Sequence, residues 1–168
     1  MSDMEKPTEC YLDTSLLFGW FKHIISKKPK TSEPQIISFL KQHPEVKTFI
    51  SSMTAAEIVE RSRKDLAKQN LSLIQIKKVV EKMQQILGFK IIDFYVATDG
   101  KEEIKDIRLN ARNIINLTFL GKDVKDAIHV EIARQNDLWW IARDDCTGTM
   151  EEIYPKIMTA KKLMKQYE

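Results

Sequence analysis

The sequence predicts an α/β protein in which a central, mostly parallel sheet lies between two layers of helices. Segments with the composition of strands alternate along the chain with longer segments whose apolar residues repeat at helical spacing. One strand-like segment, Leu138–Ala142, is apolar throughout and bounded by charges, which is typical of a strand buried on both faces of a parallel sheet. Parallel strands joined by helices require right-handed crossovers, so we expect a three-layer α/β/α sandwich.

The first part of the chain contains two predicted strands. The expected elements, in chain order, are a strand at Glu9–Leu12, a helix at Thr14–His23, an exposed loop at Ser26–Pro34, a short helix at Gln35–Gln42, a strand at Lys47–Ser51 and a helix from Thr54 to about Lys68. Thr54 and Glu57 match the S/T-x-x-E capping box, which predicts that this last helix begins at Thr54.

The second part of the chain begins with an apolar stripe that predicts a helix from Leu73 to Leu87. This helix should end at Gly88 and form a hairpin with the preceding one. The remaining elements are a strand at Phe89–Val96 with a turn at Asp99 and Gly100, helices at Ile104–Thr118 and Gly121–Asn136, the Leu138–Ala142 strand and a last helix at Pro155–Gln166.

The composition favours one folded domain over residues 1–168. The chain has 168 residues, 43% of them hydrophobic and 30% charged, which excludes a disordered or low-complexity protein. Charges interrupt every apolar run well short of the ~20 residues that cross a bilayer, and the N-terminus lacks a secretory signal, so we expect a cytoplasmic protein. The net charge of +3 is too balanced to indicate nucleic-acid binding by itself.

Four acidic residues fall where this fold binds its ligands, at the carboxyl ends of the strands. Asp13 directly follows the first strand, and Asp144 follows the strand that ends at Ala142. Glu57 lies in the first turn of the helix after the second strand, and Asp126 lies in the first turns of the helix that leads to the Leu138 strand. We therefore expect four carboxylates to converge at one edge of the sheet.

Convergence of these acids predicts a divalent cation. Two like charges at ~4 Å repel by about 4 kcal/mol at an effective dielectric of 20, and a cation would offset this cost. Mg²⁺ and Mn²⁺ prefer oxygen ligands. Each acid also has a local explanation: Asp13 can cap a helix, Glu57 can close a capping box, Asp126 can stabilise a helix N-terminus and Asp144 can begin a turn.

The segments that carry these acids resemble, in chain order, the four acidic motifs of the PIN domain ribonucleases. They are Tyr11-Leu12-Asp13-Thr14-Ser15, Thr54-Ala55-Ala56-Glu57, Asp126-Ala127-Ile128-His129 and Ile141-Ala142-Arg143-Asp144. In size the protein is similar to the toxin members (VapC) of VapBC toxin–antitoxin pairs. The resemblance spans most of the chain, and it implies a PIN-like fold.

The resemblance implies a metal-dependent endoribonuclease, a hydrolase that cleaves RNA phosphodiester bonds with metal-activated water. Asp13 and Asp126 would hold the principal Mg²⁺ or Mn²⁺, and Glu57 and Asp144 would complete its shell directly or through water. Ser15 stands where the family carries a residue that holds the acids by hydrogen bonding. The implied partners are an RNA substrate, an antitoxin protein and a second copy of the chain in a homodimer.

The sequence departs from the family pattern around the fourth acid. Ala142 stands where the family often has Thr, for which Thr147 or Thr149 could substitute, and the usual aromatic residue after the acid is absent. The fourth ligand is therefore either Asp144 or Asp145, and the spacing favours Asp144.

Other residue types give weaker functional signals. The three histidines form no metal-ligand pair, and His129, three residues after Asp126, is expected to be a half-buried structural residue. Trp139 and Trp140 are expected in the core. Arg61, Arg63 and Lys64 can contact phosphates or an acidic partner peptide, or can be solvated helix charges.

Two alternative functions are consistent with the same predicted fold. One is a non-catalytic PIN-like module that binds RNA or protein within an RNA-processing complex. The other is a phospho-acceptor receiver domain, which would require paired acids after the first strand, whereas Asp13 has no such neighbour. Retention of all four acids favours catalysis, since a binding module gains nothing from their mutual repulsion.

Overall fold

The computed structural model describes residues 6–26, 33–65, 71–92, 111–120, 123–143 and 150–168. Within these ranges one five-stranded sheet has the strand order β3-β2-β1-β4-β5, and every pair of neighbouring strands is parallel. The strands are β1 (Glu9–Leu12), β2 (Lys47–Ser51), β3 (Lys90–Ile92), β4 (Trp139–Ala142) and β5 (Ile157–Thr159).

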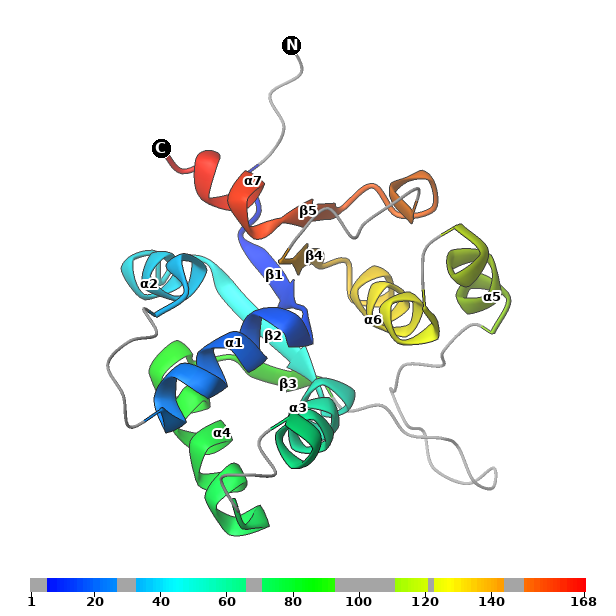
Figure 1. Cartoon of the computed structure of the whole chain (residues 1–168). Coiled ribbons are helices and arrows are strands. Elements are labelled where there is room, and N and C mark those ends of the chain that lie inside the picture. The colour runs from blue at the N-terminus through cyan, green and yellow to red at the C-terminus, as the bar shows by residue number, and fades with distance from the viewer. Residues whose placement is uncertain (1–5, 27–32, 66–70, 93–110, 121–122, 144–149) are drawn as a thin grey trace, which may run out of the picture.

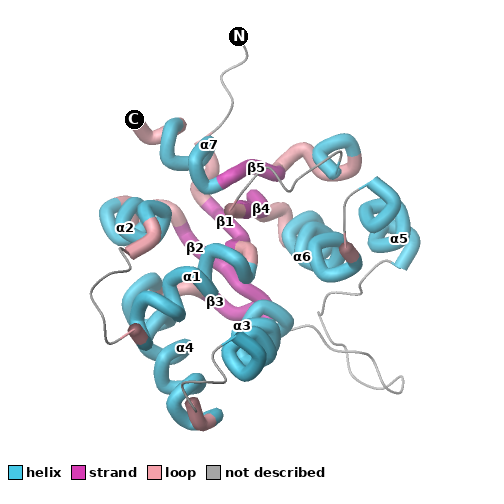
Figure 2. Tube along the Cα trace, in the orientation of Figure 1, coloured by secondary structure: helices cyan, strands magenta, loops and turns pink. Residues whose placement is uncertain are grey.

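Helices cover both faces of this sheet, as Figures 1 and 2 show. They are α1 (Thr14–Ile25), α2 (Gln35–Gln42), α3 (Ser52–Asp65), α4 (Leu73–Leu87), α5 (Ala111–Leu120), α6 (Val124–Gln135) and α7 (Ala160–Lys165), with a short 3₁₀ helix, η2, at Met150–Glu152. The structure is thus the three-layer α/β/α sandwich that the sequence predicts.

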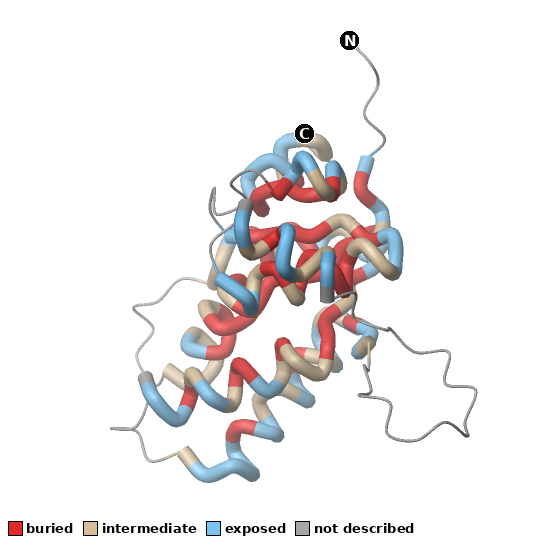
Figure 3. Tube along the Cα trace, turned by 90° about the vertical axis from the view of Figure 1, so that its right-hand side faces the viewer, coloured by how far each residue is buried: buried red, intermediate tan, exposed pale blue. Residues whose placement is uncertain are grey.

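The alternation of side chains along the strands divides the interior into two apolar cores. Cys10 and Leu12 of β1 pack on one face with residues of α1, α2, α3, α4 and α7. Tyr11 and Trp140 point to the opposite face and pack with α5 and α6. Figure 3 shows that the buried residues concentrate in the central layer. The predicted burial of Trp140 is confirmed, because its side chain is fully buried.

The strand order locates the edge where a ligand can bind. From β1 the chain proceeds to β2 and then β3 on one side, and later returns to place β4 and β5 on the other side of β1. The topological switch point therefore lies between β1 and β4, and ligands of such sheets bind outside the carboxyl ends of the strands there. The backbone N–H of Asp13 donates to the carbonyl of Ile141 at 3.0 Å, which joins the two strand ends.

One predicted helix start and one predicted element type differ from the structure. The helix predicted from Thr54 begins at Ser52, because the Ser51 hydroxyl accepts a 3.3 Å hydrogen bond from the Thr54 backbone N–H and so caps the helix two residues earlier. The helix predicted at Pro155–Gln166 is wrong in its first part, where Ile157–Thr159 pairs with β4 as strand β5.

Several predicted boundaries are confirmed and others lie outside the described residues. Helix α4 ends at Gly88, which adopts the left-handed conformation (φ 62°) that a residue without a Cβ adopts at little cost. Residues beyond Ile92 in the predicted third strand, and the first part of the helix predicted from Ile104, lie outside the described ranges. In the described parts of the chain we find no helix with the length and apolar character of a membrane span.

Candidate active site

Asp13 lies at the carboxyl end of β1 and caps helix α1. Its Oδ2 accepts hydrogen bonds from the backbone N–H of Ser15 at 2.9 Å and from the Ser15 hydroxyl at 2.5 Å. The side chain is buried, yet among the described residues no donor contacts its other oxygen, Oδ1. Within the described residues, Asp13 therefore uses one carboxylate oxygen as a helix cap and has the other open to a ligand.

Glu57 lies in the second turn of α3 and its carboxylate is held by side chains from two other helices. Oε2 accepts a short hydrogen bond from the Thr14 hydroxyl on α1 and a 3.0 Å hydrogen bond from Nε2 of His129 on α6. Oε1 lies 3.6 Å from the ammonium of Lys125. The capping-box interpretation of Glu57 is therefore wrong, because its side chain is engaged in tertiary contacts.

These contacts control the charge of Glu57. Burial raises the pKa of the carboxyl, but the hydrogen bonds from His129 and Thr14, together with the positive charge of Lys125, lower it to about 2. Glu57 is consequently ionised at neutral pH.

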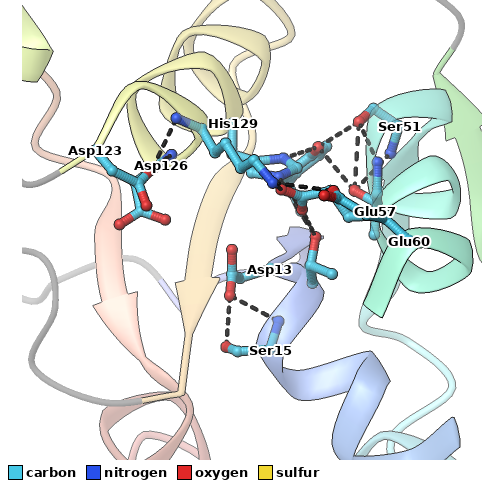
Figure 4. A network of polar contacts seen from close by, with 12 residues as sticks. Asp13, Ser15, Ser51, Glu57, Glu60, Asp123, Asp126 and His129 are labelled. Atoms are coloured by element: carbon cyan, nitrogen blue, oxygen red, sulfur yellow. Dashed lines mark hydrogen bonds and ion pairs between the residues drawn. The ribbon is translucent and has the colours of Figure 1, made fainter. Parts of the chain in front are cut away.

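His129 is fully buried, contrary to the expectation of a half-buried histidine. Its Nδ1 lies 2.7 Å from the hydroxyl of Tyr11, and that hydroxyl lies 2.7 Å from Ser51 Oγ and 3.1 Å from Thr54 Oγ1. Figure 4 shows this network running from α6 to the ends of β1 and β2. Sequence reasoning missed the network. The signal available was the position of His129, one helical turn after Asp126.

Asp126 lies in the first turn of α6, after Asp123. Asp123 is the helix cap, since its Oδ1 accepts from the backbone N–H of Lys125 at 2.7 Å and of Asp126 at 3.0 Å. The Asp126 side chain is half-buried, and no donor in the described part of the chain contacts its carboxylate. Figure 4 shows the Asp126 carboxylate pointing away from the His129 network.

The environment of Asp126 disfavours its charge. Burial raises the pKa of the carboxyl to about 6, and the negative charges of Asp123, Asp13 and Glu57 contribute in the same direction, against a smaller opposing effect of His129. The charges of Asp13 and Glu57 therefore act on Asp126, although the three residues come from three different elements.

The structure thus brings three of the four sequence-predicted acids to one edge. The fourth, Asp144, lies outside the described residues, as do Asp145, Thr147 and Thr149. The Ser15 hydroxyl donates to Asp13 Oδ2.

The oxygen donors at this edge are of the type that a hard divalent cation prefers. Within the described ranges, no group of three or more His, Cys, Asp or Glu side chains is placed so that it could hold a metal ion. Mg²⁺ is commonly held by one or two carboxylates and several waters. Asp13 Oδ1 and the Asp126 carboxylate are oxygen donors without a protein partner among the described residues, so they suit such a cation.

Basic residues flank the acidic edge on α3 and α6. The ammonium of Lys64 lies 2.5 Å from Glu60 Oε1, and that of Lys125 lies 3.2 Å from Glu60 Oε2. A surface hollow of about 450 Å³ is lined by Ala56, Val59, Glu60, Arg63 and Lys64 on α3. This part of the surface therefore carries cations beside the acids.

The similarity of this chain to known proteins is confined to solved structures. No protein-family model and no curated protein matches the chain. Among solved structures, a chain described as "Toxin-antitoxin complex from Klebsiella pneumoniae" is similar with a TM-score of 0.49 and 18% sequence identity, over 90% of this chain and 97% of that chain.

Proposed function

We propose that the protein is an endoribonuclease that hydrolyses RNA phosphodiester bonds and depends on Mg²⁺ or Mn²⁺. One observation carries the proposal: Asp126 is a half-buried carboxylate that no described donor contacts, and it lies within electrostatic reach of Asp13 and Glu57 at the switch point of the sheet. Such a group is unfavourable without a positive charge nearby. A divalent cation would remove that cost.

The residues of the site have two roles: some would bind the cation, and others hold the cation-binding side chains in place. Asp13 and Asp126 would bind the principal ion, and Glu57 and Asp144 would complete its surroundings directly or through water. When bound, the ion would lower the pKa of a water molecule and stabilise charge on the departing oxygen. Ser15 fixes Asp13, while Thr14 and His129 fix Glu57.

RNA as the substrate and a toxin role come from the resemblance to the PIN domain ribonucleases. The exposed cations Arg63 and Lys64 on α3 support a polyanionic ligand, since they could contact the RNA backbone. An antitoxin whose extended segment or helix lies against the acidic edge is part of the proposal. A neighbouring gene for a short DNA-binding protein would support that partner.

The proposal is tested by RNA cleavage with metal-stripped protein to which Mg²⁺ or Mn²⁺ is added. Cleavage should require the metal and fall at least ~100-fold in Asp13→Asn and Asp126→Asn, with the fold checked by circular dichroism. Asp123→Asn is the matched control, because Asn is also a good helix cap and Asp123 is engaged in capping. It should cleave at close to the wild-type rate.

Two results would contradict the proposal. Wild-type rates in both Asp13→Asn and Asp126→Asn would show that the assigned residues are wrong. RNA binding without cleavage by the wild-type protein, with either metal present, would instead support the alternative of a non-catalytic binding module.

A further inference from the structure

We propose that His129 is a positioning residue that holds the Glu57 carboxylate in one orientation at the cation site, an inference that rests on the proposed function. His129 belongs to α6, the helix that also carries Asp126, whereas Glu57 belongs to α3. Its Nε2 lies 3.0 Å from Glu57 Oε2, and both side chains are buried. His129 therefore connects two of the proposed metal ligands: its imidazole contacts Glu57, and its helix carries Asp126.

The direction of each hydrogen bond follows from the chemistry of the groups. An ionised carboxylate only accepts, so Nε2 of His129 must donate to Glu57. The Tyr11 hydroxyl keeps its proton because burial raises its pKa, and it can donate to Nδ1 of a neutral His129 ring. The Tyr11 oxygen in turn can accept from the hydroxyl of Ser51 or Thr54. Both ring nitrogens are thus engaged, and the ring is fixed.

This fixed ring determines which oxygen Glu57 can offer. Oε2 already accepts from Thr14 and His129, so it is occupied by protein donors. Oε1 accepts no hydrogen bond from a donor among the described residues, and the Lys125 ammonium lies 3.6 Å from it. Without His129, the Thr14 hydroxyl would be the one remaining hydrogen-bond donor to Glu57 among the described residues, beside the 3.6 Å ion pair with Lys125, and the carboxylate could turn about its terminal bond.

A purely structural role for His129 predicts different behaviour. In that case, replacing the histidine would lower stability and would weaken metal binding only as far as the fold loosens. Measuring both the Mn²⁺ affinity and the unfolding midpoint of each variant distinguishes the positioning role from the purely structural role. Removing a residue that orients a metal-bound side chain typically weakens metal affinity by ~10–100-fold.

The experiment is titration calorimetry of the full metal-stripped chain with Mn²⁺ alone, alongside thermal unfolding of each variant. His129→Leu should weaken Mn²⁺ binding by about 10–100-fold. His129→Gln, whose amide can still donate to Glu57, should recover most of that loss. Leu163→Ala removes buried side-chain volume in α7, away from the site, so it should lower the unfolding midpoint with unchanged affinity.

Tyr11→Phe keeps the inference testable if His129→Leu does not fold. It removes the donor to Nδ1 but keeps the aromatic ring, and it should weaken Mn²⁺ binding by a smaller factor, about three- to tenfold. Wild-type affinity in a folded His129→Leu, or in Tyr11→Phe if only that variant folds, would overturn the inference. Equal weakening in Leu163→Ala would overturn it as well, because affinity would then follow global stability. A wild-type chain that binds no Mn²⁺ would overturn the proposed function and this inference together.

Discussion

The Lys125 ammonium lies 3.6 Å from Glu57 Oε1, the oxygen that Thr14 and His129 leave without a hydrogen bond. The same ammonium lies 3.2 Å from Glu60 Oε2. These ion pairs join α6 to α3 across the acidic edge. A positive charge of the protein therefore stands beside the carboxylate oxygen that a bound cation would use.

We expect Lys125→Met to bind Mn²⁺ more tightly than the wild-type chain. The substitution removes a like charge beside the cation, and water screens part of the effect because the lysine is half-exposed. An increase in affinity of about three- to tenfold is expected. Lys125→Arg keeps the charge and is the control. Calorimetry that shows weaker binding to Lys125→Met would mean that the lysine supports the site instead of competing with the cation.

We expect Asp126→Asn to stabilise the metal-free protein at neutral pH. The folded-state pKa of about 6 lies above the ordinary value of 3.8, so the folded protein holds this proton more tightly than the unfolded chain does. Stability from Asp126 is complete below pH 3.8 and is lost as the pH rises through 6. Asn carries no charge and avoids that loss. Above pH 6 we expect the free energy of unfolding of Asp126→Asn to exceed that of the wild type by about 1 kcal/mol, which is less than the full pKa shift corresponds to because solvent screens the charge.

Urea unfolding in EDTA between pH 4 and 8 checks this expectation. Glu81→Gln, at an exposed position of α4, is the control and should show no comparable change with pH. An Asp126→Asn variant that is less stable than wild type at pH 7 would indicate that the carboxylate makes a favourable contact instead.

We expect the opposite sign for Glu57→Gln. The pKa of about 2 lies below the ordinary 4.5, so Glu57 stabilises the fold above pH 4.5 and this contribution is lost as the pH falls through 2. Replacing the carboxylate weakens the charge-assisted hydrogen bonds from His129 and Thr14, and should cost about 1.5–3 kcal/mol at pH 7. Unfolding free energies at pH 7 and pH 3 should show this cost shrinking in acid. A pH-independent cost would mean that the charge contributes nothing.

Local patterns in the sequence were sufficient for much of the fold. Strands Glu9–Leu12 and Lys47–Ser51 and helices Gln35–Gln42 and Leu73–Leu87 have the predicted bounds. Their ends carry clear signals, such as the left-handed Gly88 after α4. In these elements, the residues that signal the start or end of a helix or strand lie next to it in the sequence.

The failures arise where a distant partner decides the conformation. Ile157–Thr159 is too short to show strand alternation, and only its pairing with β4 makes it a strand. Thr54 and Glu57 fit a capping box by spacing, but Ser51 caps the helix and Glu57 binds His129 and Thr14. No local spacing reveals that Tyr11 and His129, 118 positions apart, share a hydrogen bond.

We propose that the chain forms the homodimer implied by the resemblance, with α5 in the interface. Phe119 and Ile115, one turn apart on this helix, have side chains that are 86% and 54% exposed. Light scattering at micromolar concentration should give twice the 19.6 kDa chain mass for the wild type, and Phe119→Asp should reduce it to one chain. Ile74→Asp, which charges an apolar, 69% exposed position on α4, is the control. A monomeric wild type would refute the proposal.

The central claim is that Asp13, Glu57, Asp126 and Asp144 gather around one cation. Anomalous diffraction from crystals grown with Mn²⁺ tests it most directly, because it locates the ion and its ligands and distinguishes Asp144 from Asp145. We predict a strong peak bound by oxygens of Asp13 and Asp126, with Glu57 Oε1 bound directly or through water. Crystals that contain saturating Mn²⁺ and show no peak between Asp13 and Asp126 would contradict the account.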